Sequence, residues 1–417
     1  MEPSVRRFKR KVNRFLGQRR IVVIMSLATA GFILLLRLLG VLQFWELQAF
    51  DRLLQLRPPT PIDQRIVIVT IGEAEMQKLG QSLISDQVMA DLLTKITAQQ
   101  PQVIGLDFYR NLPTDPGRGA LDQVLRSTPN IIGITKVIGD NKLPAIPGNP
   151  TLVKAGQVAA SDVVIDLDGR VRRGLLIPNP DADMPLGGLS FRLALTYLAN
   201  QGIKPDATSD LLKLRCVKFT NFAANDGGYV GADAGGYQIL LNPRGASGSF
   251  TMIAADDVLA GRLPPKALKG KIVLLGSTLG GQADAFFTSY SSFGGNSPTI
   301  MYGVELQAHL TSQIIGAVLD RRPLLQVVPD GAEGLMILLC AGLASLINNQ
   351  GSTYLRKSLL TGALIGVLLV ASYGALLHGW WLPVVPCTIA SFIGSIAMLT
   401  YSAQKLKTLS ARDDLTQ

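Results

Sequence analysis

Four long apolar stretches constrain this chain more than any other feature, because a soluble fold rarely accommodates so many of them. A membrane core about 30 Å thick takes roughly 20 helical residues to cross. One stretch lies near the amino terminus and three near the carboxyl terminus, at residues 21–45, 328–347, 359–377 and 381–401. We therefore expect four transmembrane helices, with residues 46–326 as one large polar region on a single side of the membrane.

Three ionisable residues lie inside the first two stretches. Arg37 interrupts the first, and one arginine near the outer third of a span can extend its guanidinium to the lipid headgroups. Asp330 and Glu333 lie in the first turns of the second, where carboxylates suit a helix N-terminus at the membrane interface. We therefore expect interfacial positions for all three, and not a proton relay.

Charge predicts the orientation of the chain. Residues 1–20 carry a net charge of +7, the loop after the second stretch +2 and residues 402–417 +1, which together account for the formal +10 of the whole chain. These segments fall on one side if four spans alternate, and basic segments stay cytoplasmic. We expect both termini inside a bacterial inner membrane, surrounded by membrane lipid, and residues 46–326 in the periplasm or outside the cell.

The same charge balance argues against a nucleic-acid partner. The sequence pI is about 9.6, which is common among nucleic-acid-binding proteins. Outside the three basic segments, however, acidic and basic residues are equal in number, so the large polar region carries no net positive charge. We therefore expect no nucleic acid to bind.

Within the polar region, continuous β-branched runs alternate with amphipathic segments. Strands buried on both faces of a parallel sheet have such continuous runs. We predict strands at 65–71, 102–108, 130–138 and 270–277, and helices at 86–99, 119–127 and 303–319. Residues 161–178 suggest a hairpin turning at Asp168-Gly169, and residues 204–255 are rich in glycine. The expected fold is an α/β domain with a largely parallel sheet and an antiparallel insertion, plus four transmembrane helices.

Polar side chains are expected at the carboxyl ends of the predicted strands, where open α/β sheets bind ligands. Gathered carboxylates there suit a cation or a polyol. An alternative is that Glu73 and Asp107 cap following helices or bind loop amides, which is common after strands. The predicted ligand-binding residues are Glu73, Asp107, Ser277, Thr278 and Asp284.

The sequence shows no pattern typical of catalysis or of metal binding. His309 and His378 are its only histidines, so a histidine-based metal cluster is excluded, and we expect His309 to be a packed or capping residue. We predict no catalytic residue, no metal and no cofactor. An anion site is conceivable among the charged residues 166–173, but acidic and basic side chains paired across a hairpin turn are the favoured interpretation.

Several short motifs occur in the order found in one family of sensory domains. They are Ala49-Phe-Asp-Arg52, Leu56-Arg-Pro58, Ile71-Gly-Glu73, Val103-Ile-Gly-Leu-Asp107, Asp166-Leu-Asp-Gly-Arg-Val-Arg-Arg173, Asn242-Pro-Arg-Gly245, Asp257-Val-Leu-Ala-Gly-Arg-Leu-Pro264, Gly270-Lys-Ile-Val-Leu-Leu-Gly276 and Tyr302-Gly-Val-Glu-Leu-Gln-Ala308.

In this order the motifs resemble the second CHASE family, CHASE2, over residues 46–402. The resemblance implies an extracellular sensory domain, associated with cyclases and histidine kinases and usually followed by three membrane spans. It names no ligand. Two positions depart from the family pattern: Gln307 replaces a frequent histidine, and Thr288-Ser-Tyr290 replaces a common Thr-Pro.

The last residues, Asp413-Asp-Leu-Thr416, are similar to the entry of a GGDEF diguanylate cyclase domain, although an ordinary polar tail is the alternative. The resulting hypothesis is a receptor input module, not itself an enzyme, that controls cyclic di-GMP synthesis by a cyclase absent from this chain. Because GGDEF cyclases act as dimers, we expect a homodimer. Two alternatives stay open: an envelope assembly or interaction protein, and a membrane-anchored periplasmic enzyme.

Overall fold

The computed structural model describes residues 3–79, 83–139, 144–179, 182, 185–206, 212–279, 284–291, 299–350 and 353–414. The chain divides into two compact units. The helical unit comprises Met1–Leu54, Ala224–Ala232 and Gln326–Gln417, and the α/β unit comprises Gln55–Ala223 and Asp233–Leu325.

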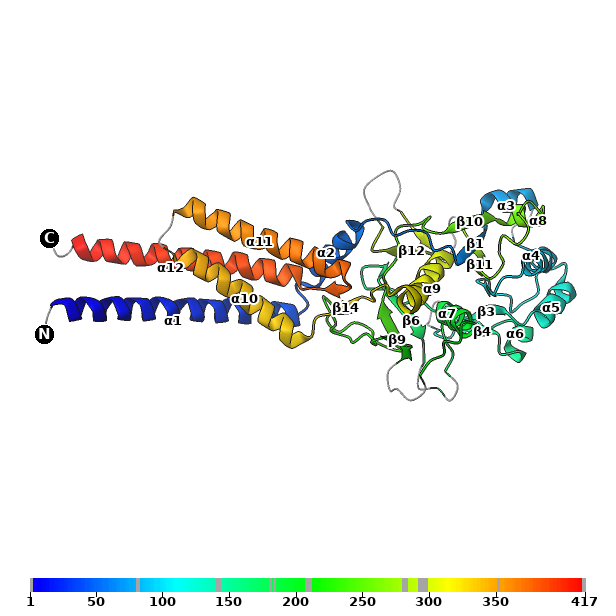
Figure 1. Ribbon diagram of the computed structural model, residues 1–417, viewed down its shortest axis with the longest axis horizontal. Helices are drawn as coiled ribbons and strands as arrows, with labels where there is room; N and C mark the ends of the chain where they lie inside the picture. Colours follow the sequence, from blue (N-terminus) through cyan, green and yellow to red (C-terminus); the bar gives the residue numbers. More distant parts are fainter. Residues whose placement is uncertain are drawn as a thin grey trace. The chain divides into compact units, whose positions relative to one another are not determined.

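Long apolar helices dominate the helical unit. Its helices are α1 (Pro3–Leu38), α2 (Gln43–Gln55), α10 (Asp330–Asn349), α11 (Tyr354–Leu377) and α12 (Val384–Asp414). Among the described residues, four segments are long and apolar enough to cross a membrane: Arg20–Leu38, Asp330–Asn349, Tyr354–Leu377 and Val384–Lys405. α1, α10 and α12 pack against one another, and α11 packs against α10 and α12 (Figure 1).

The helical unit also contains a turn after α1 and a short pair of strands. α1 ends at Leu38, before Trp45, and Gly40 follows in the left-handed region with φ of 74°. That conformation favours glycine, which has no Cβ to clash with the backbone. A short parallel pair, β14 (Gln326–Val327) with β15 (Trp380–Trp381), joins the segments that precede α10 and α12.

A six-stranded parallel sheet forms the centre of the α/β unit, in the order β10-β1-β11-β2-β3-β4. The strands are β1 (Ile66–Ile71), β2 (Val103–Leu106), β3 (Ile131–Thr135), β4 (Val158–Ala160), β10 (Thr251–Ala254) and β11 (Ile272–Ser277). Strands β1, β2, β3 and β11 are the four predicted from apolar runs, and both faces of these strands are buried.

Helices cover both faces of this sheet. One face carries α3 (Glu73–Leu79), α4 (Asp86–Ala98), α5 (Arg118–Ser127), α6 (Pro150–Lys154) and α8 (Ala255–Leu259). The other carries α7 (Leu189–Ala199) and α9 (Gly303–Asp320). Alternate residues of each strand enter the two cores: Ile66 and Ile68 of β1 face α7 and α9, whereas Val67 and Val69 face the other helices.

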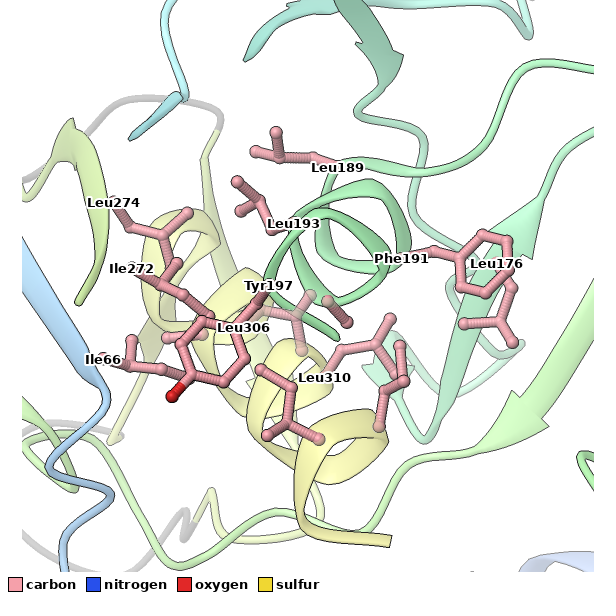
Figure 2. Packing of buried hydrophobic residues seen from close by; sticks show 14 of the residues in the cluster. Ile66, Leu176, Leu189, Phe191, Leu193, Tyr197, Ile272, Leu274, Leu306 and Leu310 are labelled. Atoms are coloured by element: carbon pink, nitrogen blue, oxygen red, sulfur yellow. The ribbon is translucent and has the colours of Figure 1, made fainter. Parts of the chain in front are cut away.

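Figure 2 shows the core on the α7 and α9 side, where Leu193 and Tyr197 of α7 meet Leu306 of α9 and Leu274 of β11. Glycines let these layers approach closely. A Cβ placed on Gly276 of β11 would lie 2.4 Å from the Cβ of Val304, so a larger residue there would push α9 away from the sheet.

Short strands outside the sheet form the antiparallel insertion. β6 (Arg173–Ile177) pairs with β9 (Tyr237–Leu240), and β7 (Lys213–Leu214) pairs with β8 (Val217–Lys218). β12 (Ala285–Thr288) pairs antiparallel with β13 (Met301–Tyr302) and parallel with β5 (Arg170–Val171). The predicted fold class is confirmed.

The hairpin expected over residues 161–178 was wrong in its pairing. The turn exists, since the Gly169 amide donates to the Asp166 carbonyl at 2.8 Å, but residues 161–169 form no strand. β5 pairs with β12 and β6 with β9. Local turn signals predicted the turn, whereas the partner strands lie far away in the sequence and left no local signal.

Candidate functional site

The carboxyl ends of three neighbouring strands form the candidate ligand site of the α/β unit. β11 lies between β1 and β2, and all three run parallel. After β1 and β2 the chain leads to α3, α4 and α5 on one face, whereas after β11 it leads to α9 on the opposite face. Open α/β sheets bind ligands outside the carboxyl ends of their strands at such a reversal.

Asp107 and Asp284 lie close to each other at this edge. Asp107 follows β2, and burial together with the negative charge of Asp284 raises its pKa well above the usual value. Burial also raises the pKa of Asp284 to about 6. Neither carboxylate hydrogen-bonds to another described side chain. Two carboxyl groups that hinder each other's ionisation are stabilised by a shared proton, a cation or hydroxyl donors.

The position of Asp284 depends on a glycine. Its carbonyl accepts a hydrogen bond of 2.9 Å from the amide of Gly303, the first residue of α9. Its carboxylate lies so near that a Cβ on Gly303 would be 2.1 Å from Oδ1. No real Cβ tolerates such a contact, so Gly303 is required by this close approach.

The other three predicted residues differ from the aspartate pair. Ser277 is buried at the end of β11, and its hydroxyl accepts from the Leu279 amide at 3.2 Å, which makes it a turn residue. Thr278 lies beside Gly72, where a Cβ would be 3.1 Å from the Thr278 hydroxyl oxygen. Glu73 is exposed at the start of α3. Among the five predicted residues, as far as the structure describes them, only Asp107 and Asp284 are linked by an interaction between their charged groups.

Among the described residues, no hydrogen bond supports the alternative role of Glu73 and Asp107 as capping or amide-binding groups. The Gly72 amide donates to Glu75 at 2.9 Å, so Glu75 and not Glu73 closes the first turn of α3. The carboxylate of Asp107 accepts no hydrogen bond from the described residues, and α5 begins only at Arg118. The ligand-binding role of the five residues stays a prediction.

Sequence reasoning missed Tyr109, two residues beyond Asp107. Its hydroxyl lies 2.8 Å from the Ser161 hydroxyl. Burial raises its pKa, and the charges of Asp107 and Asp284 raise it further, which places the phenol near both carboxyl groups. A polar aromatic residue just after a buried strand was the available signal.

In the described part of the chain, no three histidine, cysteine, aspartate or glutamate residues are arranged to hold a metal ion.

The charged segment 166–173 has the paired arrangement favoured from the sequence. Arg172 donates to Asp166 at 2.8 Å and to Asp168 at 2.9 and 2.6 Å. Arg173 donates to Asp166 at 2.7 Å and to Gln238 at 2.8 Å. Both arginines are almost completely buried, so this network is part of the core of the α/β unit and not an open anion site.

Comparison with known protein families gives one match, to the CHASE2 domain, over residues 28–346. The matched segment is well over half of the chain. The chain belongs to the CHASE2 domain family. Comparisons with curated proteins and with solved structures gave no match.

A CHASE2 domain is an extracytoplasmic sensory domain without catalytic activity, and together with the apolar helices it makes this chain a membrane sensor protein. The CHASE2 match begins inside α1 and ends inside α10. It therefore includes Arg37, Glu333 and the loop Ala224–Ala232, all of which belong to the helical unit.

Arg37 holds this loop against the helices. Its Nε donates to Glu333 of α10 at 2.8 Å, and Nη1 and Nη2 donate to the carbonyls of Tyr229 and Asn225, both at 3.1 Å. A further bond reaches the Gly227 carbonyl. Arg37 is only 8% exposed, so the expectation that it extends to the headgroups was wrong. Its partner Glu333 lies in the first turn of α10, as expected, and is only 5% exposed because it pairs with Arg37.

The same loop contacts the segment that leads into α12. A Cβ on Gly227 would lie 2.5 Å from the ring of Trp381, and a Cβ on Gly228 would lie 2.7 Å from Cγ of Glu46. Glu46 accepts from the Trp381 indole at 3.0 Å and from the amides of Val384 and Val385 at 3.2 and 2.8 Å. Glu46 therefore caps the first turn of α12, while burial raises its pKa to about 7.

Proposed function

We propose that this chain is the membrane-bound input module of a receptor, which senses an extracytoplasmic signal and transmits it to a cytoplasmic output domain. The supporting observation is the loop Ala224–Ala232. It interrupts the sequence of the α/β unit, yet it packs within the helical unit through Arg37, Glu46 and Trp381. A change in the α/β unit that displaces either end of this loop therefore acts on α1, α10 and the start of α12.

The proposed orientation places both termini in the cytoplasm and residues 46–326 in the periplasm. The concentration of the net charge in three segments supports it. A periplasm-active reporter fused near residue 200 is expected to be active, and one fused after Tyr401 inactive. The opposite pattern would refute the orientation.

The proposed output is cyclic di-GMP synthesis by a diguanylate cyclase domain beyond Gln417. The resemblance of Asp413-Asp-Leu-Thr416 to the entry of a GGDEF domain supports this, with residues 415–417 lying outside the described part of the chain. α12 runs to Asp414, so it would lead directly into such a domain. GGDEF cyclases act as dimers, and a homodimer whose α12 helices change their separation would regulate one.

The proposed signal is a small extracytoplasmic ligand bound at the carboxyl edge of the sheet, held by Asp107 and Asp284, with Glu73, Thr278 and Ser277 around them. The raised pKa values of the two aspartates support a ligand that supplies positive charge or hydroxyl donors. To transmit, this ligand must bind one state of the protein more tightly than the other.

Transmission can be tested without the ligand by releasing the loop. Arg37→Gln removes the charge that binds Glu333 and most of the donors that hold the loop carbonyls. Cysteines introduced one at a time at positions 405, 407 and 410 report the proximity of two α12 helices by disulfide crosslinking in membranes. The background carries Cys216→Ser, which removes the exposed native cysteine, whereas Cys340 and Cys387 are buried. We expect Arg37→Gln to change the crosslinking pattern.

The matched control is Arg20→Gln, because Arg20 is an exposed arginine on the same helix. This control should keep the crosslinking pattern of the parent chain. Identical patterns in all three proteins would contradict transmission through the loop.

A further inference from the structure

The first and last of the four points where the main chain passes between the two units lie close to one loop of the α/β unit. Arg57 lies just after α2, and Arg322 lies just after α9, a few residues before α10. Both arginines bind Asn242 and Pro243, and the Asn242 amide group donates to the Pro323 carbonyl at 2.9 Å. A change around Asn242 and Pro243 therefore affects both the segment after α2 and the segment before α10.

The acceptors of these two guanidinium groups are neutral. Arg57 Nη1 donates to the Asn242 side chain at 2.7 Å, and Nη2 donates to the Pro243 carbonyl and the Tyr290 hydroxyl, both at 3.2 Å. Arg322 Nη2 donates to the carbonyls of Asn242 at 2.7 Å and Pro243 at 3.0 Å. Within the described residues, neither arginine forms an ion pair.

Three buried N–H donors of this cluster have no acceptor among the described residues: Arg57 Nε, Arg322 Nη1 and His309 Nε2. The His309 tautomer follows from its other nitrogen, because Nδ1 accepts from the Arg244 amide at 3.2 Å and the proton must then be on Nε2. His309 is completely buried. Each buried donor without an acceptor carries a desolvation cost, so a cluster of three is unusual.

Asp63, a carboxylate whose charge acts on Arg322, already has other partners. Asp63 accepts from Arg244 at 2.9 Å, from Arg65 at 2.7 Å and from Ser312 at 2.8 Å. The positive charge of this region also lowers the pKa values of Arg322 and His309. Burial and the charges of Arg244 and Arg57 lower the pKa of Arg322 to about 10, and burial with the charges of Arg322 and Arg244 lowers that of His309 to about 3.

We propose that the cluster of Arg57, Arg322 and His309 binds a small oxyanion of the phosphate or sulfate class. An oxyanion supplies several acceptor oxygens and the missing negative charge, and guanidinium groups bind such anions through paired N–H donors. Arg57 is half-buried, which leaves the anion an approach from its side. The bound anion would bridge the connections to α2 and to α10, and so hold them together.

A phosphate group has two possible sources, a free anion or a phospholipid headgroup. Isothermal titration calorimetry of the full chain in a neutral detergent, with inorganic phosphate and sulfate against chloride at equal ionic strength, tests the free anion. Thermal unfolding in nanodiscs of phosphatidylcholine, with and without phosphatidylglycerol, tests the lipid.

We expect saturable binding of phosphate or sulfate, with a rise in Tm of about 3 °C at roughly tenfold excess over Kd. Arg322→Gln and Arg57→Gln should each weaken binding at least roughly tenfold. Arg57→Lys keeps the charge but lacks Nε and should also weaken binding, which guards against a glutamine variant that does not fold. Arg321→Gln, at the exposed neighbouring arginine, should bind as the parent does.

Two results would support the proposal: anion binding in detergent that depends on these arginines, or a rise in Tm that requires phosphatidylglycerol and the same arginines. The second result would identify the lipid as the source. No saturable effect in either medium, or an effect unchanged in both arginine variants, would overturn it.

Discussion

Two regions of the α/β unit hold carboxylates in opposite ways. Around Arg172 and Arg173, each carboxylate oxygen of Asp166 meets a guanidinium at 2.7 or 2.8 Å. At the sheet edge, the negative charge of Asp284 acts on Asp107, and the pKa values of both carboxyl groups are raised. The comparison indicates that the first region stabilises the fold, whereas the second holds two carboxyl groups that no described side chain hydrogen-bonds and that a ligand can use.

The largest effect on stability is expected for the buried ion pairs of Arg172. Arg172→Gln removes the ion pairs to Asp166 and Asp168 and leaves buried negative charge, so it should lower the free energy of unfolding by about 3–5 kcal/mol. All three tryptophans lie in the helical unit, so circular dichroism is a better probe than fluorescence. Arg262→Gln, which removes an exposed pair with Asp257, should change stability by less than about 1 kcal/mol. If Arg172→Gln and Arg262→Gln lowered the free energy of unfolding equally, the buried ion pairs would be no more important for stability than the exposed one.

The next effect concerns the glycine beside the aspartate pair. Gly303→Ala introduces a Cβ into the Asp284 carboxylate and should lower the free energy of unfolding by about 1–3 kcal/mol. Asp284→Ala removes the obstructing atoms, so the double variant should recover part of the loss, as measured by thermal unfolding. A loss that Asp284→Ala does not relieve would show that the contact is not the cause.

A smaller effect should appear as pH dependence. The pKa of Asp284 is about 6 in the folded protein against an ordinary 3.8, so the folded state binds this proton more tightly. Stability should therefore fall as the pH rises from about 4 to about 6, by about 1–2 kcal/mol from this group. Asp284→Asn should reduce this slope, measured as Tm against pH. A wild-type Tm that rises across this interval with no change in the variant would contradict the assignment.

The smallest effect is expected at Glu73, which is exposed at the edge of the same site. Glu73→Gln should change the free energy of unfolding by no more than about 0.5 kcal/mol. A larger loss of unfolding free energy, measured by thermal unfolding, would mean that Glu73 has a structural partner. Glu73 would then resemble the ion-paired carboxylates around Arg172 and not the aspartates of the site.

Much of the α/β fold was predictable because buried parallel strands carry a strong local signal. The β-branched runs at 65–71 and 270–277 became β1 and β11, and the helix expected at 303–319 is α9. The apolar helix α7 and the edge strand β10 were not predicted. β10 has only four residues in a glycine-rich region, and it joins the sheet only by pairing with β1.

The candidate site was predictable in position but not in detail. Strand ends indicated where Asp107 and Ser277 would lie, because parallel strands end at one edge. The pairing of Asp107 with Asp284, the contact of Asp284 with Gly303 and the partner of Arg37 all join residues distant in the sequence. Arg37 and Glu333 are 296 positions apart, and a hydropathy pattern cannot indicate that they meet.

The placement of the loop Ala224–Ala232 has a practical consequence for dissecting this protein. The main chain passes between the two units at four points, after residues 54, 223, 232 and 325. A soluble fragment cut at residues 55 and 325 would separate the loop from Arg37 and Trp381 and leave its glycines without the surfaces that they contact. Replacing residues 224–232 by a short polar linker should therefore give a better-behaved sensor fragment than simple truncation.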